Sequence, residues 1–192
     1  MKDTDMHVLI IGAAGMIGRK LAESIATTNQ MGGMTVTSLT LVDVMKPQVA
    51  TVFTGTRTAV AADLTEPGTA ERLIAARPDV IVHLAAIVSG EAEADFNKGY
   101  TINLDGTRML FDAIRSIDGY TPKVIYASSL AVFGAPFPAK IPDDYHLTPL
   151  TSYGTQKAIG ELLLNDYSRR GFLDGIGIRF PTICIRPGKP NK

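Results

Sequence analysis

Short apolar runs alternate along the chain with longer segments in which apolar residues recur at helical spacing. Six of the runs are typical of strands, at 7–11, 38–44, 57–64, 79–85, 123–129 and 176–185. Four of the longer segments are typical of helices, at 16–28, 68–77, about 91–117 and 152–170. The run at 79–85 lacks polar alternation, as expected for a strand buried on both faces. The pattern predicts a parallel sheet with helices on both of its faces.

Right-handed crossovers leave few ways to order such a sheet. We expect an α/β Rossmann fold, a doubly wound three-layer structure with the strand order 3-2-1-4-5-6 along the chain. Gly171 is expected to cap the helix at 152–170. Residues 1–186 are expected to form one domain. The basic, proline-rich residues 187–192 are expected to begin a linker to a second domain that this chain lacks.

Composition narrows the class of protein. The 19 basic and 19 acidic residues cancel, so no strong overall field points to nucleic acid or an anionic membrane. The single cysteine, Cys184, excludes an intrachain disulfide and suits a reducing compartment. No apolar stretch approaches the roughly 20 residues that span a bilayer. We therefore expect a cytoplasmic protein without a nucleic-acid, membrane or metal partner, and we expect His83 to be a core residue.

A glycine-rich loop separates the first strand from the first helix. Gly12, Gly15 and Gly18 form the pattern G-x-x-G-x-x-G, with Met16 and Ile17 inside it. Glycine permits a tight turn and lets the backbone approach a pyrophosphate, and the helix that follows offers N–H groups and a partial positive charge. The loop is therefore either an ordinary strand-to-helix turn or the phosphate site of a dinucleotide.

Two aspartates favour the dinucleotide. Asp43 ends the second predicted strand, where a carboxylate can accept hydrogen bonds from an adenosine ribose and would repel a 2′-phosphate, so the predicted cofactor is NAD rather than NADP. The polar stretch at 27–35 is expected to be a long loop, which would explain the unusual distance of Asp43 from the glycines. Asp63 ends the third predicted strand and could reach the adenine amino group. Either aspartate could instead be a solvated residue at a strand end.

Tyr153 and Lys157 lie four residues apart in a predicted helix, so they share a face. A nearby ammonium lowers the pKa of a tyrosine from its usual value of about 10. The pair could therefore exchange a proton with an alcohol or a carbonyl, although this spacing is also common on amphipathic helices. Ser128 and Ser129 end the fifth predicted strand, at the sheet edge where ligands bind. We expect one serine to hold the reacting hydroxyl and the other to cap or turn the chain.

Seven ordered motifs resemble those of the extended short-chain dehydrogenase/reductases, the group that contains nucleotide-sugar epimerases and dehydratases. They are GAAGMIG, LVDV, ADL, VIVHLAA, NLDGTRMLFDA, YASSLAVFG and YGTQK, and they span nearly the whole chain. The resemblance implies Ser129, Tyr153 and Lys157 as catalytic residues, with Lys157 also on the nicotinamide ribose. It further implies that NAD lies along Leu64, Leu84, Ala85, Ala86, Pro181 and Thr182. Asn103 matches the family asparagine beneath the site, where a structural role is equally open.

The resemblance also restricts the chemistry. Sugar 4,6-dehydratases carry acidic residues where this chain has SLA at 129–131, which leaves dehydrogenation or 4-epimerisation. The stretch at 179–191 resembles family members that act on sugar acids such as D-erythronate, and sugar-nucleotide epimerases. Arg186 is either a contact for an anionic substrate or a surface charge. We expect an NAD-dependent enzyme that oxidises a secondary alcohol of a sugar acid. A 4-epimerase and an NAD-binding module without turnover remain alternatives, and the family often dimerises through two long helices, here 91–117 and 152–170.

Overall fold

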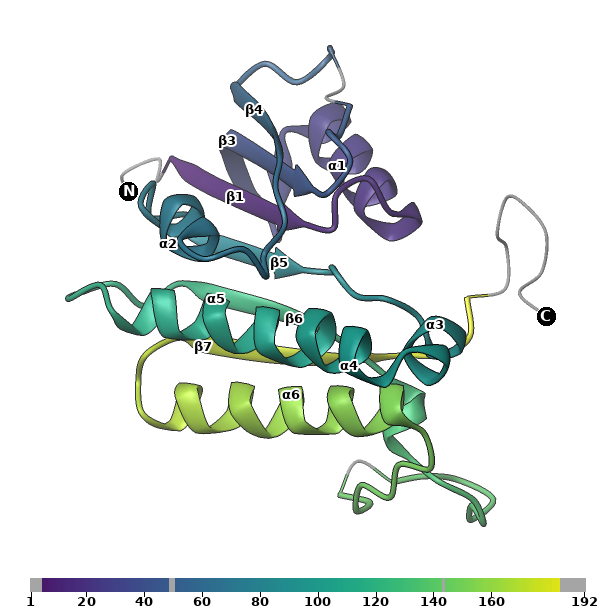
Figure 1. Cartoon of the computed structure of the whole chain (residues 1–192). Coiled ribbons are helices and arrows are strands. Elements are labelled where there is room, and N and C mark those ends of the chain that lie inside the picture. Colours follow the sequence, from purple (N-terminus) through teal and green to yellow (C-terminus); the bar gives the residue numbers. More distant parts are fainter. Residues whose placement is uncertain (1–4, 49–50, 143, 184–192) are drawn as a thin grey trace.

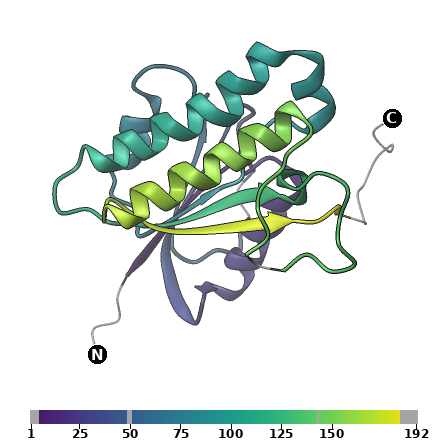
Figure 2. The ribbon, with the colours of Figure 1, turned by 90° about the horizontal axis from the view of Figure 1, so that it is seen from below.

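The computed structural model describes residues 5–48, 51–142 and 144–183. In these residues a parallel sheet lies between α1 (Met16–Thr28) on one face and several helices on the other (Figures 1 and 2). The parallel strands are β1 (Met6–Ile11), β3 (Met34–Asp43), β4 (Thr56–Ala61), β5 (Val80–His83), β6 (Lys123–Ser129) and β7 (Asp174–Phe180). They lie in the order β4-β3-β1-β5-β6-β7, which is 3-2-1-4-5-6 when these strands are counted along the chain. The predicted Rossmann topology is confirmed.

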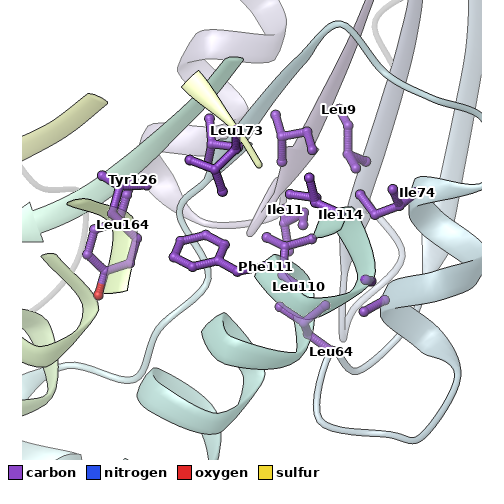
Figure 3. Close-up of a cluster of buried hydrophobic side chains, with 14 of the residues drawn as sticks. Leu9, Ile11, Leu64, Ile74, Leu110, Phe111, Ile114, Tyr126, Leu164 and Leu173 are labelled. Carbon is purple, nitrogen blue, oxygen red and sulfur yellow. The ribbon is translucent and has the colours of Figure 1, made fainter. Parts of the chain in front are cut away.

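Both faces of the sheet are packed by helices because successive strand residues point to opposite sides. Val8 and Ile10 of β1 pack in a buried cluster with α1. Leu9 and Ile11 pack in a second cluster on the other face (Figure 3). Side chains of three helices close that face: α2 (Thr69–Ile74), α5 (Gly106–Arg115) and α6 (Ser152–Arg169). The unbroken apolar strands in the sequence are therefore buried on both sides, as the pattern predicts.

Within the stretch at 27–35, Thr27 and Thr28 belong to α1 and residues 30–35 form a hairpin, so the prediction of a loop was wrong. Asn29 ends α1 in the left-handed conformation, and β2 (Gln30–Met31) then pairs antiparallel with the start of β3. Gly32 and Gly33 connect the two strands with φ angles of 59° and 80°. A two-residue turn with positive φ at both positions matches the right-handed twist of a hairpin, and glycine adopts it without strain. This hairpin accounts for the extra residues between the glycine loop and Asp43.

The predicted helix at about 91–117 is not continuous. It consists of α3 (Ser89–Ala94), α4 (Phe96–Gly99), a π-helix (Tyr100–Asp105) and α5. Asp95 interrupts the first turns because its backbone is extended and its carboxylate accepts a hydrogen bond from the N–H of Lys98. Aspartate is favoured at such capping positions because its short side chain can replace a helical hydrogen bond.

Of the remaining predicted elements, α1 and β6 have the predicted ends, and the others are present with shifted ends. The predicted strand at 176–185 is β7, which ends at Phe180 because Pro181 has no N–H to donate to a neighbouring strand. Cys184, at the end of that prediction, lies outside the described residues. Gly171 follows α6 with a φ of 74°, and its N–H donates to the carbonyl of Ser168 at 2.9 Å, which confirms the predicted cap. No helix in the described part of the chain is both long and apolar enough to cross a membrane.

Candidate active site

The glycine loop connects the carboxyl end of β1 to α1, and two of its glycines are required by packing. Gly12 has a φ of 89°, and a Cβ atom there would lie 2.6 Å from the backbone nitrogen of Ala85. A Cβ atom on Gly18 would lie 2.3 Å from the carbonyl oxygen of Gly12. Both contacts are with backbone, which cannot move aside without shifting the ends of β1 or β5. These two glycines therefore let the loop, α1 and the chain after β5 lie close together.

Gly15 is different, because packing alone does not explain it. It is exposed, its backbone is extended at the N-cap of α1, and its nearest obstacle to a Cβ atom is a carbonyl oxygen at 3.2 Å. No side chain caps α1, and the first turn of α1 carries no acidic residue. Met16, Ile17 and Gly18 of that turn line the same hollow as Gly15, and the first N–H groups of a helix have no partner within the helix. This hollow has the form of an anion site that the missing side chain of Gly15 leaves open.

The two predicted aspartates lie together beside this loop. The carboxylate of Asp43, at the end of β3, accepts a hydrogen bond from the N–H of Ala14 at 2.9 Å. Asp63 follows β4 and accepts hydrogen bonds from the N–H and hydroxyl of Thr65 at 2.9 and 2.7 Å. Both aspartates line one hollow of about 210 Å³ with Gly12 and Gly15. Asp43 is therefore tied to the glycine loop rather than being a solvated strand end.

Three adjoining hollows form one groove across the carboxyl ends of the strands. The first, beside Asp43, also contains the predicted residues Leu64, Leu84, Ala85 and Ala86. The second, of about 320 Å³, shares Gly12, Gly15 and Leu84 with it and adds Met16, Ile17 and Gly18. The third, of about 400 Å³, shares Ile17 and Leu84 with the second and contains Ser129, Tyr153, Lys157, Pro181 and Thr182. The fold thus brings all the predicted site residues that it describes, except Asn103, to one groove.

Tyr153 and Lys157 come from the first two turns of α6, which is capped by the hydroxyl of Thr151. The ammonium nitrogen of Lys157 lies 5.9 Å from the centroid of the Tyr153 ring and donates to the carbonyl oxygen of Ala127 at 2.8 Å. Only 2% of Lys157 is exposed, and this burial lowers its pKa from 10.5 to about 8. At pH 7 the lysine is therefore still charged, beside the ring of Tyr153.

The two serines at the end of β6 have different surroundings. Ser128 is buried, and its hydroxyl donates to a carboxylate oxygen of Glu161 on α6. Ser129 is half-buried, and its hydroxyl oxygen accepts a hydrogen bond from the N–H of Ala131 at 3.1 Å. Both line the third hollow with Tyr153. Because Ser128 is engaged in the protein interior, Ser129 is the better candidate to hold a substrate hydroxyl.

Asn103 lies beneath the groove and does not line any of its three hollows. Its buried amide accepts from the N–H of Ile87 at 2.9 Å and donates to the carbonyl of Ile87 at 3.1 Å and to Gln156 at 2.7 Å. It thereby ties the chain after β5, where Ile87 lines the first hollow, to α6. Arg186, the predicted substrate contact, lies outside the described residues.

Sequence reasoning placed His83 correctly and missed two other residues. His83 is buried and its Nε2 lies 2.9 Å from the hydroxyl of Thr107, while burial lowers its pKa to about 3. Glu161 was missed, although it lies one turn beyond Lys157 and forms a two-pronged ion pair with Arg179 of β7. Tyr126, whose ring lies 4.8 Å from the Lys157 ammonium, was also missed. Helical spacing could have indicated Glu161, but no local pattern indicates Tyr126.

The chain is similar in sequence to a known family and to curated proteins. The NAD dependent epimerase/dehydratase family matches the chain over residues 8–187. Two curated relatives are named D-erythronate dehydrogenase: one from Cupriavidus necator is 46% identical over 97% of this chain, and one from Haemophilus influenzae is 45% identical over 97%. The chain spans 58% of the length of each of these relatives.

Solved structures show the same fold. A nucleoside-diphosphate-sugar epimerase from Agrobacterium tumefaciens superposes with a TM-score of 0.93 and 66% identity, over 97% of this chain and 56% of that one. A UDP-glucose 4-epimerase from Brucella ovis in complex with NAD has a TM-score of 0.74 and 28% identity, over 91% and 51%. The family description names NAD, the predicted cofactor, and the Brucella structure contains it. The chain belongs to the NAD dependent epimerase/dehydratase family.

Proposed function

We propose that this chain binds NAD along the groove and, through Tyr153, oxidises a secondary alcohol of a sugar acid such as D-erythronate. The observation that carries the proposal is the third hollow, where Ser129, Tyr153 and Lys157 meet at the end of the groove that begins at the glycine loop. The two relatives at 46% and 45% identity that are named D-erythronate dehydrogenase support this substrate class.

Each part of the groove has a role in this proposal. The N–H groups at Gly15 and the first turn of α1 hold the pyrophosphate, and Asp43 accepts hydrogen bonds from the adenosine ribose. Bound NAD supplies the hydride acceptor. Ser129 orients the substrate hydroxyl, and Tyr153, as a phenolate favoured by the Lys157 ammonium, accepts its proton. Pro181 and Thr182 line the nicotinamide end, and Asp63 faces the adenine.

Calorimetry followed by a turnover assay tests this proposal. We expect the purified chain to bind NAD more tightly than NADP, and four-carbon sugar acids to produce NADH that is detected by its absorbance. Tyr153→Phe should reduce turnover by about 10³-fold while NAD affinity stays unchanged, because the ring remains but the proton acceptor is lost. If Tyr153→Phe lost NAD affinity as strongly as turnover, the role assigned to Tyr153 would be contradicted. If the unmodified chain bound neither NAD nor NADP, the whole proposal would be contradicted.

A second candidate is a sugar-nucleotide 4-epimerase, favoured by the 66% identity to the Agrobacterium structure, which is named a nucleoside-diphosphate-sugar epimerase. An epimerase returns its hydride to the substrate, so it produces no net NADH. A UDP-sugar that is interconverted without NADH release would support this candidate. A third candidate is a chain that binds NAD without turnover. Binding of NAD with no reaction on sugar acids or UDP-sugars would support it.

Two further expectations concern the whole protein. We propose a homodimer through α4–α5 and α6, which lie side by side on one outer face (Figure 2). This proposal is supported by two large exposed apolar residues on these helices, Phe96 at 59% and Leu162 at 61% exposure. Light scattering should show a dimer for the wild type and a monomer for Leu162→Glu.

We also propose a cytoplasmic location. The single cysteine supports this proposal, and cell fractionation tests it.

A further inference from the structure

The Lys157 ammonium is buried without an ion pair among the described residues. Its one hydrogen bond to protein in that part of the chain goes to the carbonyl oxygen of Ala127. Glu161 lies one turn further along α6, but its carboxylate is bound to Arg179 and to the hydroxyl of Ser128. Burying a lysine with so few partners strongly disfavours its charged form. The groups that contact the ammonium therefore determine how much of its charged form is retained.

The face of the Tyr126 ring is the second such group, after the Ala127 carbonyl. Tyr126 is completely buried on β6, and the Lys157 nitrogen lies 4.8 Å from its ring centroid, closer than it lies to the Tyr153 ring. An aromatic face attracts a cation through its quadrupole, and this attraction reaches about 2 kcal/mol where water is excluded. Burial also raises the pKa of Tyr126, so this ring stays neutral.

Packing in the core fixes the position of the Tyr126 ring. Tyr126 packs in the core between the sheet and α6, beside Leu164 (Figure 3). Its hydroxyl passes under α6 at Gly160, where a Cβ atom would lie 2.2 Å from the Tyr126 oxygen. That hydroxyl has no hydrogen-bond partner among the described residues. The hydroxyl therefore gives no hydrogen-bonding reason for a tyrosine at this position, and the ring is the part that interacts.

We propose that Tyr126 is a positioning residue whose ring face keeps the Lys157 ammonium charged and fixed between β6 and Tyr153. The inference rests on the proposed role of Lys157 beside Tyr153. Without the ring, only the Ala127 carbonyl and long-range charges would oppose the cost of burial, and Lys157 would lose its proton at lower pH. Tyr153 would then lose the neighbouring charge that favours its phenolate.

The other ionisable groups around Lys157 do not replace the ring. His83 faces it from β5 and is neutral, because its pKa lies near 3. Glu161 of α6 and Arg179 of β7 neutralise one another in their ion pair. Tyr153, on the same face of α6, is the group on which Lys157 acts. The balance at Lys157 is therefore set by burial, which lowers its pKa, and by the ring, which raises it.

NMR titration of lysine side chains labelled with ¹³C at Cε tests this directly, in the full chain and without NAD or substrate. The Lys157 signal is assigned by its loss in Lys157→Met. We expect Tyr126→Phe to retain the Lys157 pKa, because the ring face remains, and Tyr126→Leu to lower it by about one pH unit. Site-specific replacement of Tyr126 by pentafluorophenylalanine keeps the ring shape but inverts its quadrupole, and it should lower the pKa similarly even if Tyr126→Leu does not fold.

The proposal is overturned if the pentafluorinated ring leaves the Lys157 pKa where Tyr126→Phe leaves it, or if Tyr126→Phe alone lowers it. Because the titration needs no turnover, it decides the role of the ring even if no sugar acid is oxidised. Where turnover is measurable, the rate–pH profile gives a second readout. Its alkaline limb should shift to lower pH in the Tyr126→Leu and fluorinated variants, by the same number of pH units as the Lys157 pKa. A purely structural role would lower the rate without moving that limb.

Discussion

The two ends of the groove are built in different ways. At the proposed phosphate end, which is the glycine loop, seven contiguous residues, 12–18, provide the turn, the helix start and the close contact with the chain after β5. At the proposed catalytic end, Ser129, Tyr153 and Lys157 come from two elements. Tyr126 contacts Lys157 from beneath, while Asn103 and Glu161 bind the neighbouring residues Gln156 and Ser128. The comparison teaches that a backbone site can be encoded locally, whereas a site made of side chains depends on a supporting shell that is dispersed in the sequence.

The largest effect is expected in the glycine loop, where substitution of one glycine should impair folding and substitution of another should impair NAD binding. Gly12→Ala would place a Cβ atom against the Ala85 backbone at a positive φ, and it should lower the free energy of unfolding by at least about 3 kcal/mol. Gly15→Ala is the matched control, because its nearest contact is 3.2 Å, and it should change stability by less than about 1 kcal/mol. Gly15→Ala should nevertheless weaken NAD binding, since the methyl group enters the groove.

Urea unfolding and calorimetry measure both quantities in both variants. If Gly15→Ala binds NAD as well as the wild type, the phosphate end is only a tight turn, and the contrast between the two ends of the groove is lost.

The support beneath the catalytic end is tested by its buried ion pair. Glu161 is 7% exposed, and Glu161→Gln leaves the Arg179 guanidinium without its carboxylate, so we expect the free energy of unfolding to fall by about 2 kcal/mol. Ser128→Ala removes one hydrogen bond to the same carboxylate and should cost about 1 kcal/mol. Because the two residues share a partner, the double variant should cost less than the sum. Strict additivity in urea unfolding would mean that they do not act as one network.

The smallest effect is a pH dependence of stability that arises from Lys157. Its pKa is lowered from 10.5 to about 8 on folding, so between these pH values the unfolded chain binds more protons than the folded one. Stability therefore gains from Lys157 as pH rises from about 8 toward 10.5, by about 1 kcal/mol at pH 9 relative to pH 7.5. Lys157→Met should lack this contribution, and the difference between the two denaturation curves isolates it from other titrating groups. A pH-independent difference would mean that Lys157 titrates alike in the folded and unfolded states.

Predictions from sequence succeeded where the signal was local. The strand at 123–129 was predicted with its observed ends, and Asp43 was placed at the end of its strand. The predicted helix at 91–117 failed at Asp95, since a capping aspartate inside an apolar pattern cannot be distinguished from a solvated one without knowing the backbone. The glycine pair at 32–33 was taken as part of a loop, although two glycines between short extended segments also indicate a hairpin.

The sequence by itself determined the alternation of strands and helices, the glycine turn and the helical spacing of Tyr153 and Lys157, because each depends on residues close together in the chain. Only the tertiary structure decided that Ser128 is engaged by Glu161, that Asn103 supports the groove from below, and that Lys157 rests on Tyr126. These contacts join residues separated by 16 to 53 positions, and the Lys157 pKa depends on the water that their packing excludes. Burial and distance are properties of the packed chain, and they set the chemistry of this site.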